Sequence, residues 1–134
     1  MLVNRSMPAA TVIPVLAYED VGQAVEWLCE TFGFTERWRA GNHRAQLAVG
    51  DGAVAVTEGQ ASAATTVMVR VEDATRHHEH ARARGARILQ PPADYPYGER
   101  QYTVEDLGGH RWTFSQSIAD VAPEEWGGTS GHLS

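Results

Sequence analysis

The sequence is poor in cysteine, in basic residues and in long apolar runs, and each shortage excludes a class of protein. A single cysteine, Cys29, permits no intrachain disulfide and no zinc site built on several thiolates. With 11 Lys and Arg against 17 Asp and Glu, the formal charge is −6, the wrong sign for binding a phosphate backbone. No segment approaches the ~18 apolar residues of a membrane span, and the first residues lack a signal-peptide pattern. We therefore expect a cytoplasmic protein that binds neither nucleic acid nor membranes.

The sequence does contain enough apolar material for one folded domain. Hydrophobic residues make up 43% of the 134 positions, and four Trp, four Tyr and three Phe are among them. This composition lies outside the range of disordered chains, and the length is that of a single domain. We expect one domain that spans residues 1–134.

The first part of the chain, residues 11–58, has the pattern of a strand, a helix and three further strands. The stretch TVIPVLAY predicts a strand, and Pro14 within it indicates either an edge strand or one exchanged between two chains. Asp20 and Gly33 bound a segment with apolar residues at helical spacing, and these residue types start and end helices. Two glycine-containing turns then join three short strands. The segment therefore predicts a βαβββ module.

The second part, residues 65–117, repeats this order. The strand TTVMVRV runs into Glu72-Asp73 just as the first strand runs into another Glu-Asp pair. A polar helix containing HHEH ends at Gly85, and the strands ARILQ, ERQYTVED and HRWTFSQS follow, with PPADYPYG predicted as a loop after the first of them. Residues 59–64 form a small-residue linker, and residues 118–134 form a tail with a short docking turn.

Two such modules predict an α+β domain with two curved mixed sheets. Each sheet has a helix on its outer face only, so the other faces must be buried against each other and enclose a cleft. We expect the functional site in that cleft.

Two segments carry a family resemblance. They are VIPVLAYEDVGQAVEWLCETFGF and YPYGERQYTVEDLGGHRWTFSQ, and the second is similar to a pattern in which Tyr-x-x-Gly is followed by Asp-Pro-x-Gly-His. Together they resemble the vicinal oxygen chelate superfamily of glyoxalases, bleomycin-resistance proteins, fosfomycin-resistance proteins and extradiol dioxygenases. The resemblance covers residues 12–116 and implies one glyoxalase/bleomycin-resistance-like domain of two βαβββ modules.

The resemblance also indicates where a metal would be bound. Metal-dependent members use a histidine on the first strand and a glutamate on the last strand of each module. The matching positions here are Ile13, Val56, Thr66 and Thr113, with Ala55 in place of Val56 if the register shifts by one residue. A divalent metal needs several charged or strongly donating ligands, which these four side chains do not supply. We therefore expect no metal, no cofactor and no catalytic residue. Glu58, two residues beyond Val56, leaves a displaced metal ligand as an alternative.

The remaining candidates are aromatic and polar side chains on the strands and on the loop before the last hairpin. Rings can sandwich a flat ligand, and hydroxyl, amide and guanidinium groups can orient it. The candidate ligand-binding residues are Trp38, Gln46, Val56, Glu58, Tyr95, Tyr97, Tyr102, Arg111 and Thr113. Arg111 either borders the cleft or pairs with Glu99 or Glu105 across the hairpin.

Other residue types that often carry chemistry receive structural interpretations. In HHEH, the histidine spacing is not that of a zincin helix, so we expect a solvated helix face with His77 or His78 against the sheet. Strand alternation assigns Trp112 to the core. Cys29 is interpreted as a packing residue.

These observations favour a metal-free binding protein of the bleomycin-resistance type, a homodimer that sequesters an apolar or aromatic small molecule. The alternative is an enzyme of the same superfamily: a lyase, isomerase or dioxygenase, either metal-free or with a shifted metal site. A scaffold domain with a collapsed cleft is the third hypothesis.

Overall fold

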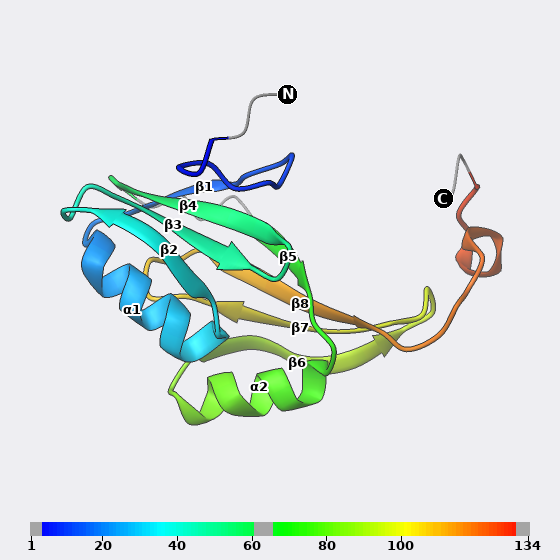
Figure 1. Ribbon diagram of the computed structural model, residues 1–134. Coiled ribbons are helices and arrows are strands. Elements are labelled where there is room, and N and C mark those ends of the chain that lie inside the picture. The colour runs from blue at the N-terminus through cyan, green and yellow to red at the C-terminus, as the bar shows by residue number, and fades with distance from the viewer. Residues whose placement is uncertain (1–3, 61–65, 131–134) are drawn as a thin grey trace.

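Two four-stranded mixed sheets form the framework of the computed structural model, which describes residues 4–60 and 66–130 (Figure 1). The first sheet has the order β1-β4-β3-β2 and consists of β1 (Val15–Tyr18), β2 (Thr35–Ala40), β3 (Arg44–Val49) and β4 (Gly52–Glu58). The second has the order β5-β8-β7-β6 and consists of β5 (Thr66–Arg70), β6 (Arg87–Tyr95), β7 (Glu99–Glu105) and β8 (Arg111–Ser117). In each sheet the first strand pairs in parallel with the last, which confirms the repeated βαβββ module and the α+β class.

One helix in each module follows the first strand and packs on its own sheet. The Asp20 carboxylate accepts a hydrogen bond from the Gln23 amide at 3.0 Å and caps α1 (Val21–Phe32), while Gly33, with φ of 80°, ends it. Asp73 caps α2 (Ala74–Ala83) in the same way. In the described part of the chain, neither helix has the length and apolar character needed to cross a bilayer.

A shared hydrophobic core joins the helix-side faces of the two sheets. Phe32, the last residue of α1, lies against Trp112 and Phe114 of the second sheet, with ring centroids 5.6 and 4.9 Å apart. Trp112 is fully buried, as its position in the strand predicts. The two modules of one chain are therefore held together through the face that carries the helices.

A buried carboxylate adds a polar link between the modules. Asp106, at the end of β7, accepts hydrogen bonds from the Tyr18 hydroxyl at 2.5 Å and from Trp112 Nε1 at 2.9 Å. The backbone amides of Gly108 and His110 donate to its other oxygen. Burial, followed by the charge of Asp106, raises the pKa of Tyr18 above its ordinary range, so the phenol remains a donor.

One sequence prediction about the second module is wrong. The segment predicted as the loop PPADYPYG is strand as far as Tyr95, because β6 continues through both prolines. β6 is the edge strand of its sheet. Proline has no amide hydrogen to donate, and an edge strand can accommodate it where no neighbouring strand needs that hydrogen bond. Irregular register between Ile88 and Ala93 accommodates the change of direction. Of the predicted linker 59–64, residues 61–64 lie outside the described residues.

The tail returns to the tip of the β6–β7 hairpin. Gly98, in the turn of that hairpin, accepts backbone hydrogen bonds from Ile118 at 2.8 Å and Ala119 at 3.3 Å. A short 3-10 helix, η1 (Pro123–Trp126), follows and is the docking turn expected in this segment. In Figure 1 it stands at the end of the molecule away from the two helices.

Candidate functional site

The open face of the first sheet carries an apolar cavity of about 410 Å³. Strand register places Val15 and Gln46 on either side of Ala55, and Trp38 beside Gln46, so these side chains share the face opposite α1. Ile13 and Met7 also line the cavity. A concave, mainly apolar surface with a few polar groups is the usual form of a small-molecule site.

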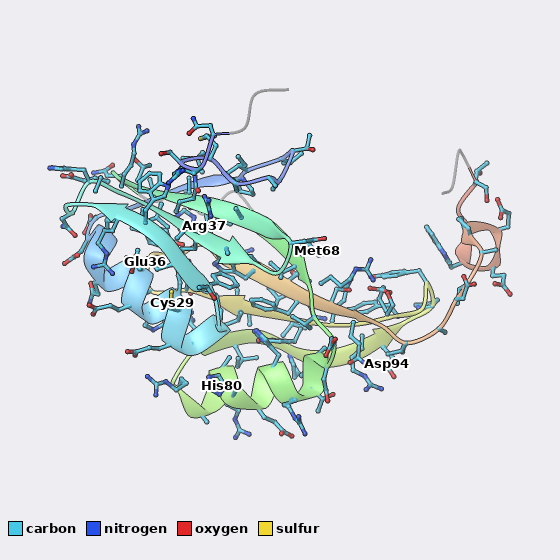
Figure 2. All side chains as sticks on the ribbon, in the orientation of Figure 1. Cys29, Glu36, Arg37, Met68, His80 and Asp94 are labelled. Atoms are coloured by element: carbon cyan, nitrogen blue, oxygen red, sulfur yellow. The ribbon has the colours of Figure 1, made fainter. Side chains whose placement is uncertain are left out.

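The N-terminal segment crosses this face and narrows the cavity. Trp38 Nε1 donates a hydrogen bond to the Ser6 carbonyl at 3.0 Å, and the Arg37 guanidinium donates to the Arg5 carbonyl at 3.0 Å. Arg37, which Figure 2 labels on the side of the sheet away from α1, also donates to the Gln46 amide oxygen. The Gln46 side chain, which is only 3% exposed, therefore has a hydrogen-bond partner among the apolar side chains of the cavity.

The open face of the second sheet is polar instead. The hydroxyls of Thr103 and Thr113 are 3.0 Å apart, and the Gln101 amide donates to the Ser115 hydroxyl at 3.0 Å. Ser115 in turn donates to Glu99 at 2.6 Å. Neighbouring strands thus satisfy one another's polar side chains on this face, and Met68, beside Thr113, adds an exposed apolar side chain to it.

Arg111 borders this polar face in an exposed position. The Glu105 carboxylate pairs with Arg87 at 3.0 Å, and Glu99 accepts from Ser115. Neither of the two cross-hairpin pairings considered for Arg111 is therefore present among the described residues.

The structure divides the predicted site residues among four places. Trp38 and Gln46 meet in the cavity of the first sheet. Tyr95 and Tyr97 lie at the tip of the β6–β7 hairpin, and Arg111 and Thr113 lie on the open face of the second sheet. The helix-side faces carry the remaining three predicted residues: Val56, Glu58 and Tyr102.

The side chains of these last three point to the helix side because side chains alternate along a strand, although Val56 still contributes to the lining of the cavity. Val56 pairs with Leu16 in the core beneath α1, and its side chain is fully buried. Glu58 lies two residues further on the same face, where His43 contacts it at 2.7 Å in an exposed pair. Tyr102 packs beside Phe114 with its ring 1% exposed. Glu58 therefore lies on the face opposite the cavity of the first sheet.

Two further cavity residues are absent from the predicted binding set. Ala55 lines the cavity beside Val56, and a shift of one residue in register exchanges the two positions. Met7 comes from the segment before β1, where no periodicity or motif marks it.

His77, on α2, is half-buried and faces the end of α1. Its Nε2–H donates to the Phe32 carbonyl at 3.1 Å, and its Nδ1 accepts from the Tyr102 hydroxyl. The imidazole also lies 4.1 Å from the Phe114 ring, which confirms that a histidine of the HHEH segment packs on the sheet. Burial is the main cause that lowers the pKa of His77, although its bond to Phe32 opposes the shift. The role of this histidine is structural.

Comparison with known proteins identifies the family. A model of the glyoxalase/bleomycin resistance protein/dioxygenase superfamily matches residues 10–114. The chain belongs to this superfamily. No protein of curated function matches the chain.

Solved structures of superfamily members have the same fold. TioX from Micromonospora sp. ML1 is 35% identical, with a TM-score of 0.74 over 82% of this chain and 100% of TioX. A glyoxalase/bleomycin resistance protein/dioxygenase from Nocardioides is 21% identical, with a TM-score of 0.67 over 96% of this chain and 91% of that one. The bleomycin-binding protein from bleomycin-producing Streptomyces verticillus, solved with copper(II)-bleomycin, is 22% identical, with a TM-score of 0.66 over 82% of this chain and 98% of that one.

The superfamily's metal positions do not form a ligand set in this chain. Ile13 contributes an apolar side chain to the cavity, Val56 lies in the core, and the Thr113 hydroxyl pairs with Thr103. Thr66 is exposed at the start of β5. In residues 4–60 and 66–130, no three His, Cys, Asp or Glu side chains come close enough to share a metal ion. These donors do not fit a divalent metal centre.

Proposed function

We propose that this superfamily member is a small-molecule-binding protein that sequesters an apolar or aromatic ligand in the cavity of the first sheet without a metal. The main support for this proposal is the cavity itself. Trp38 contributes an aromatic ring, Val15 and Ala55 contribute apolar surface, and Gln46 contributes a buried polar group. Burial of a flat ligand here gains about 25 cal/mol per Å² of apolar surface removed from water. Likeness to a bleomycin-binding protein supports the same class of function.

Fluorescence titration tests the proposal. The ligand panel consists of planar aromatic compounds and peptide antibiotics, with metal-free bleomycin among them. We expect at least one member to change the intrinsic Trp emission, and Trp38→Phe to abolish that change because Trp38 lines the cavity. Trp27→Phe, on α1, is the matched control and keeps the response. A panel in which no compound binds would contradict the proposal.

A charge placed on the cavity floor gives a second test. Ala55→Asp must desolvate a carboxylate when an apolar ligand binds, so we expect the ligand Kd to rise at least about tenfold. Thr103→Asp adds the same charge to the open face of the other sheet and leaves the Kd within about twofold. Equal effects of the two variants would remove the cavity as the binding site.

Metal independence is tested on the same complex. Protein dialysed against a chelator keeps its ligand affinity, and added Zn²⁺, Mn²⁺ or Ni²⁺ does not change it. Ligand binding that is lost with the chelator and restored by one of these ions would contradict the metal-free proposal and favour the enzyme alternative.

We further propose that the protein acts as a cytoplasmic homodimer. Val15 on β1 and Met68 on β5 are large apolar side chains that are 64% and 63% exposed, as expected for strands covered by a second copy. Sedimentation equilibrium is expected to give the mass of two chains, and Val15→Asp with Met68→Asp to give that of one. A wild-type protein that stays monomeric at 100 μM would contradict the dimer.

A further inference from the structure

Three aromatic side chains from two separate segments meet at the tip of the β6–β7 hairpin. Tyr95 and Tyr97 are stacked, with ring centroids 5.4 Å apart and planes 14° from parallel. Trp126 of η1 meets Tyr97 with centroids 5.8 Å apart and planes at 68°. Tyr97 and Trp126 thus form two walls of an aromatic corner, and they remain 36% and 44% exposed. Figure 1 shows η1 beside this hairpin tip, beyond the edge of both helices.

The aromatic corner is held in place by backbone contacts. Gly98 has a φ of 84°, and a Cβ at this position would lie 2.4 Å from the Ala119 carbonyl oxygen, so the tail approaches the turn as closely as a glycine allows. The Glu125 carboxylate accepts from the Ala122 amide at 2.9 Å and fixes the start of η1. The orientation of Trp126 toward Tyr97 therefore follows from the fold of the tail.

The hydroxyl groups of the two tyrosines already have partners. Tyr95 accepts a hydrogen bond from the Gln90 amide at 2.9 Å, and Tyr97 donates to the Gln101 amide oxygen at 3.2 Å. A ligand at the aromatic corner therefore meets ring faces more than free hydroxyls. Ring faces carry the negative part of the aromatic quadrupole and attract cations.

A carboxylate lies next to the rings. Glu99 begins β7 directly after the turn, and it accepts from Ser115 at 2.6 Å. Burial raises the pKa of Glu99, but hydrogen bonds from the Ser115 and Ser117 hydroxyls and the charge of Arg70 outweigh it and hold this pKa below its ordinary value, so Glu99 is ionised at neutral pH. Glu99 shares its strand face with Gln101, which accepts from the Tyr97 hydroxyl, and the charge of Glu99 contributes, after burial and Tyr95, to the raised pKa of Tyr97.

The surrounding charge is also negative. Residues 118–130 contain three carboxylates and no Lys or Arg. Of the basic side chains nearby, Arg100 pairs with Asp94 at 2.7 Å, and Arg70 donates to Ser117 at 2.7 Å. Arg100 is therefore paired with a carboxylate, and Arg70 lies near enough to Glu99 to offset part of its charge, while the charged side chains of the tail beside Trp126 are all acidic.

We propose that Tyr97, Trp126 and Glu99 form a binding site for a quaternary ammonium group. A tetraalkylated nitrogen has no N–H groups that need acceptors, so it suits ring faces whose hydroxyls are occupied, and its charge complements Glu99. This site shares no residue with the cavity of the first sheet. Failure of either proposal therefore leaves the other standing.

Choline and its neutral isostere 3,3-dimethylbutan-1-ol test the role of charge, since the two probes have nearly the same shape. Ligand-observed NMR measures both affinities, and ring currents are expected to move the choline N-methyl signal upfield on binding. Choline is expected to bind at least about tenfold more tightly than the neutral isostere. Equal affinities, or no binding of choline, would overturn the proposal.

Variants test the residues named. Glu99→Gln and Trp126→Leu are each expected to weaken choline binding about tenfold. Glu105→Gln, at the other end of β7, makes the same change of charge where the carboxylate already pairs with Arg87, and keeps the wild-type affinity. Thermal unfolding of each variant verifies that it is folded. Choline affinity that survives Trp126→Leu in a folded protein would overturn the site.

A final experiment distinguishes two possible carriers of the quaternary ammonium group, a free small molecule and a lipid headgroup. Co-sedimentation with phosphatidylcholine vesicles that Glu99→Gln abolishes identifies the headgroup. Choline binding without co-sedimentation identifies a soluble ligand.

Discussion

The two modules share one fold but present different chemistry on their open faces. On the first sheet, Val15, Ala55 and Trp38 form an apolar floor. On the second, the corresponding face is a set of side chains that hydrogen-bond one another, from the Thr103–Thr113 pair to Gln101 and Ser115. Backbone topology is thus set by the helix-side core, and the open faces are free to differ. Repetition of a fold does not imply repetition of a binding surface.

The helices differ in a related way. The Glu-Asp pairs that precede the two helices are 53 residues apart, and this offset aligns Ala24 of α1 with His77 of α2. Both residues are on the face that packs inward. The first module buries a methyl group there, while the second has a half-buried imidazole that bonds Phe32 and Tyr102. The second module therefore has a titratable group where the first has none.

The largest expected effect comes from breaking the link that keeps the two modules together. Asp106→Ala leaves the Tyr18 hydroxyl, Trp112 Nε1 and two amides without their acceptor. We expect the free energy of unfolding to fall by about 3 kcal/mol, measured by urea denaturation. Tyr18→Phe removes one donor and is expected to cost about 1 kcal/mol. A loss of less than 1 kcal/mol in Asp106→Ala would show that the carboxylate does not join the modules.

A smaller effect separates the two helices by their response to pH. The pKa of His77 is lower in the folded chain than its ordinary value of 6.5, so the unfolded chain binds more protons as the pH falls below that value. Neutral His77 therefore makes its full contribution to the free energy of unfolding above about pH 6.5. This contribution is lost as the pH falls through the pKa that His77 has in the folded chain. His77→Gln is expected to flatten this dependence between pH 7 and 5, as followed by thermal unfolding.

His78→Gln on the same helix is the control for this prediction. The neighbouring His80 also contributes to the lowered pKa of His77 and stays unchanged in both variants. Equal flattening by the two variants would mean that the buried imidazole is not the source of the pH dependence.

The smallest effect is expected from making the second open face resemble the first. Thr103→Val removes the hydroxyl that meets Thr113, on a partly exposed surface where water replaces the lost bond. We expect a change of about 0.5 kcal/mol in the free energy of unfolding, measured by urea denaturation. A loss above 2 kcal/mol would show that the polar face contributes to the fold as strongly as the core.

Local sequence signals predict the order of the helices and strands, but they do not predict which face of a sheet each side chain occupies. Asp20 and Gly33 fixed α1 because capping depends on residues close in the chain. The sequence names Val56 as a binding residue but does not determine whether Val56 or Ala55 directs its side chain into the cavity, since a shift of one residue exchanges the two faces of a strand. Tyr102 was misplaced because its orientation depends on its partner, Phe114, in another strand.

The β6 segment shows a different limit of sequence reasoning. Proline, tyrosine and glycine in PPADYPYG are typical of loops, and only the position of β6 at the sheet edge makes its prolines compatible with a strand. Edge position is a property of the assembled sheet and has no local signature. Met7 illustrates the same point for the cavity, because the segment before β1 reaches it only after the sheet has formed.

The bond between Tyr18 and Asp106 has a consequence for how such a protein can be reassembled. Its donor belongs to the amino-terminal half and its acceptor to the carboxy-terminal half. A chimera that joins either half to the complementary half of a relative needs a phenol on one side and a carboxylate on the other. If one half lacks its member of this pair, the other half keeps a buried polar group without a hydrogen-bond partner. Recombination between relatives is therefore limited by the contact between the two halves, even where both binding surfaces can be exchanged.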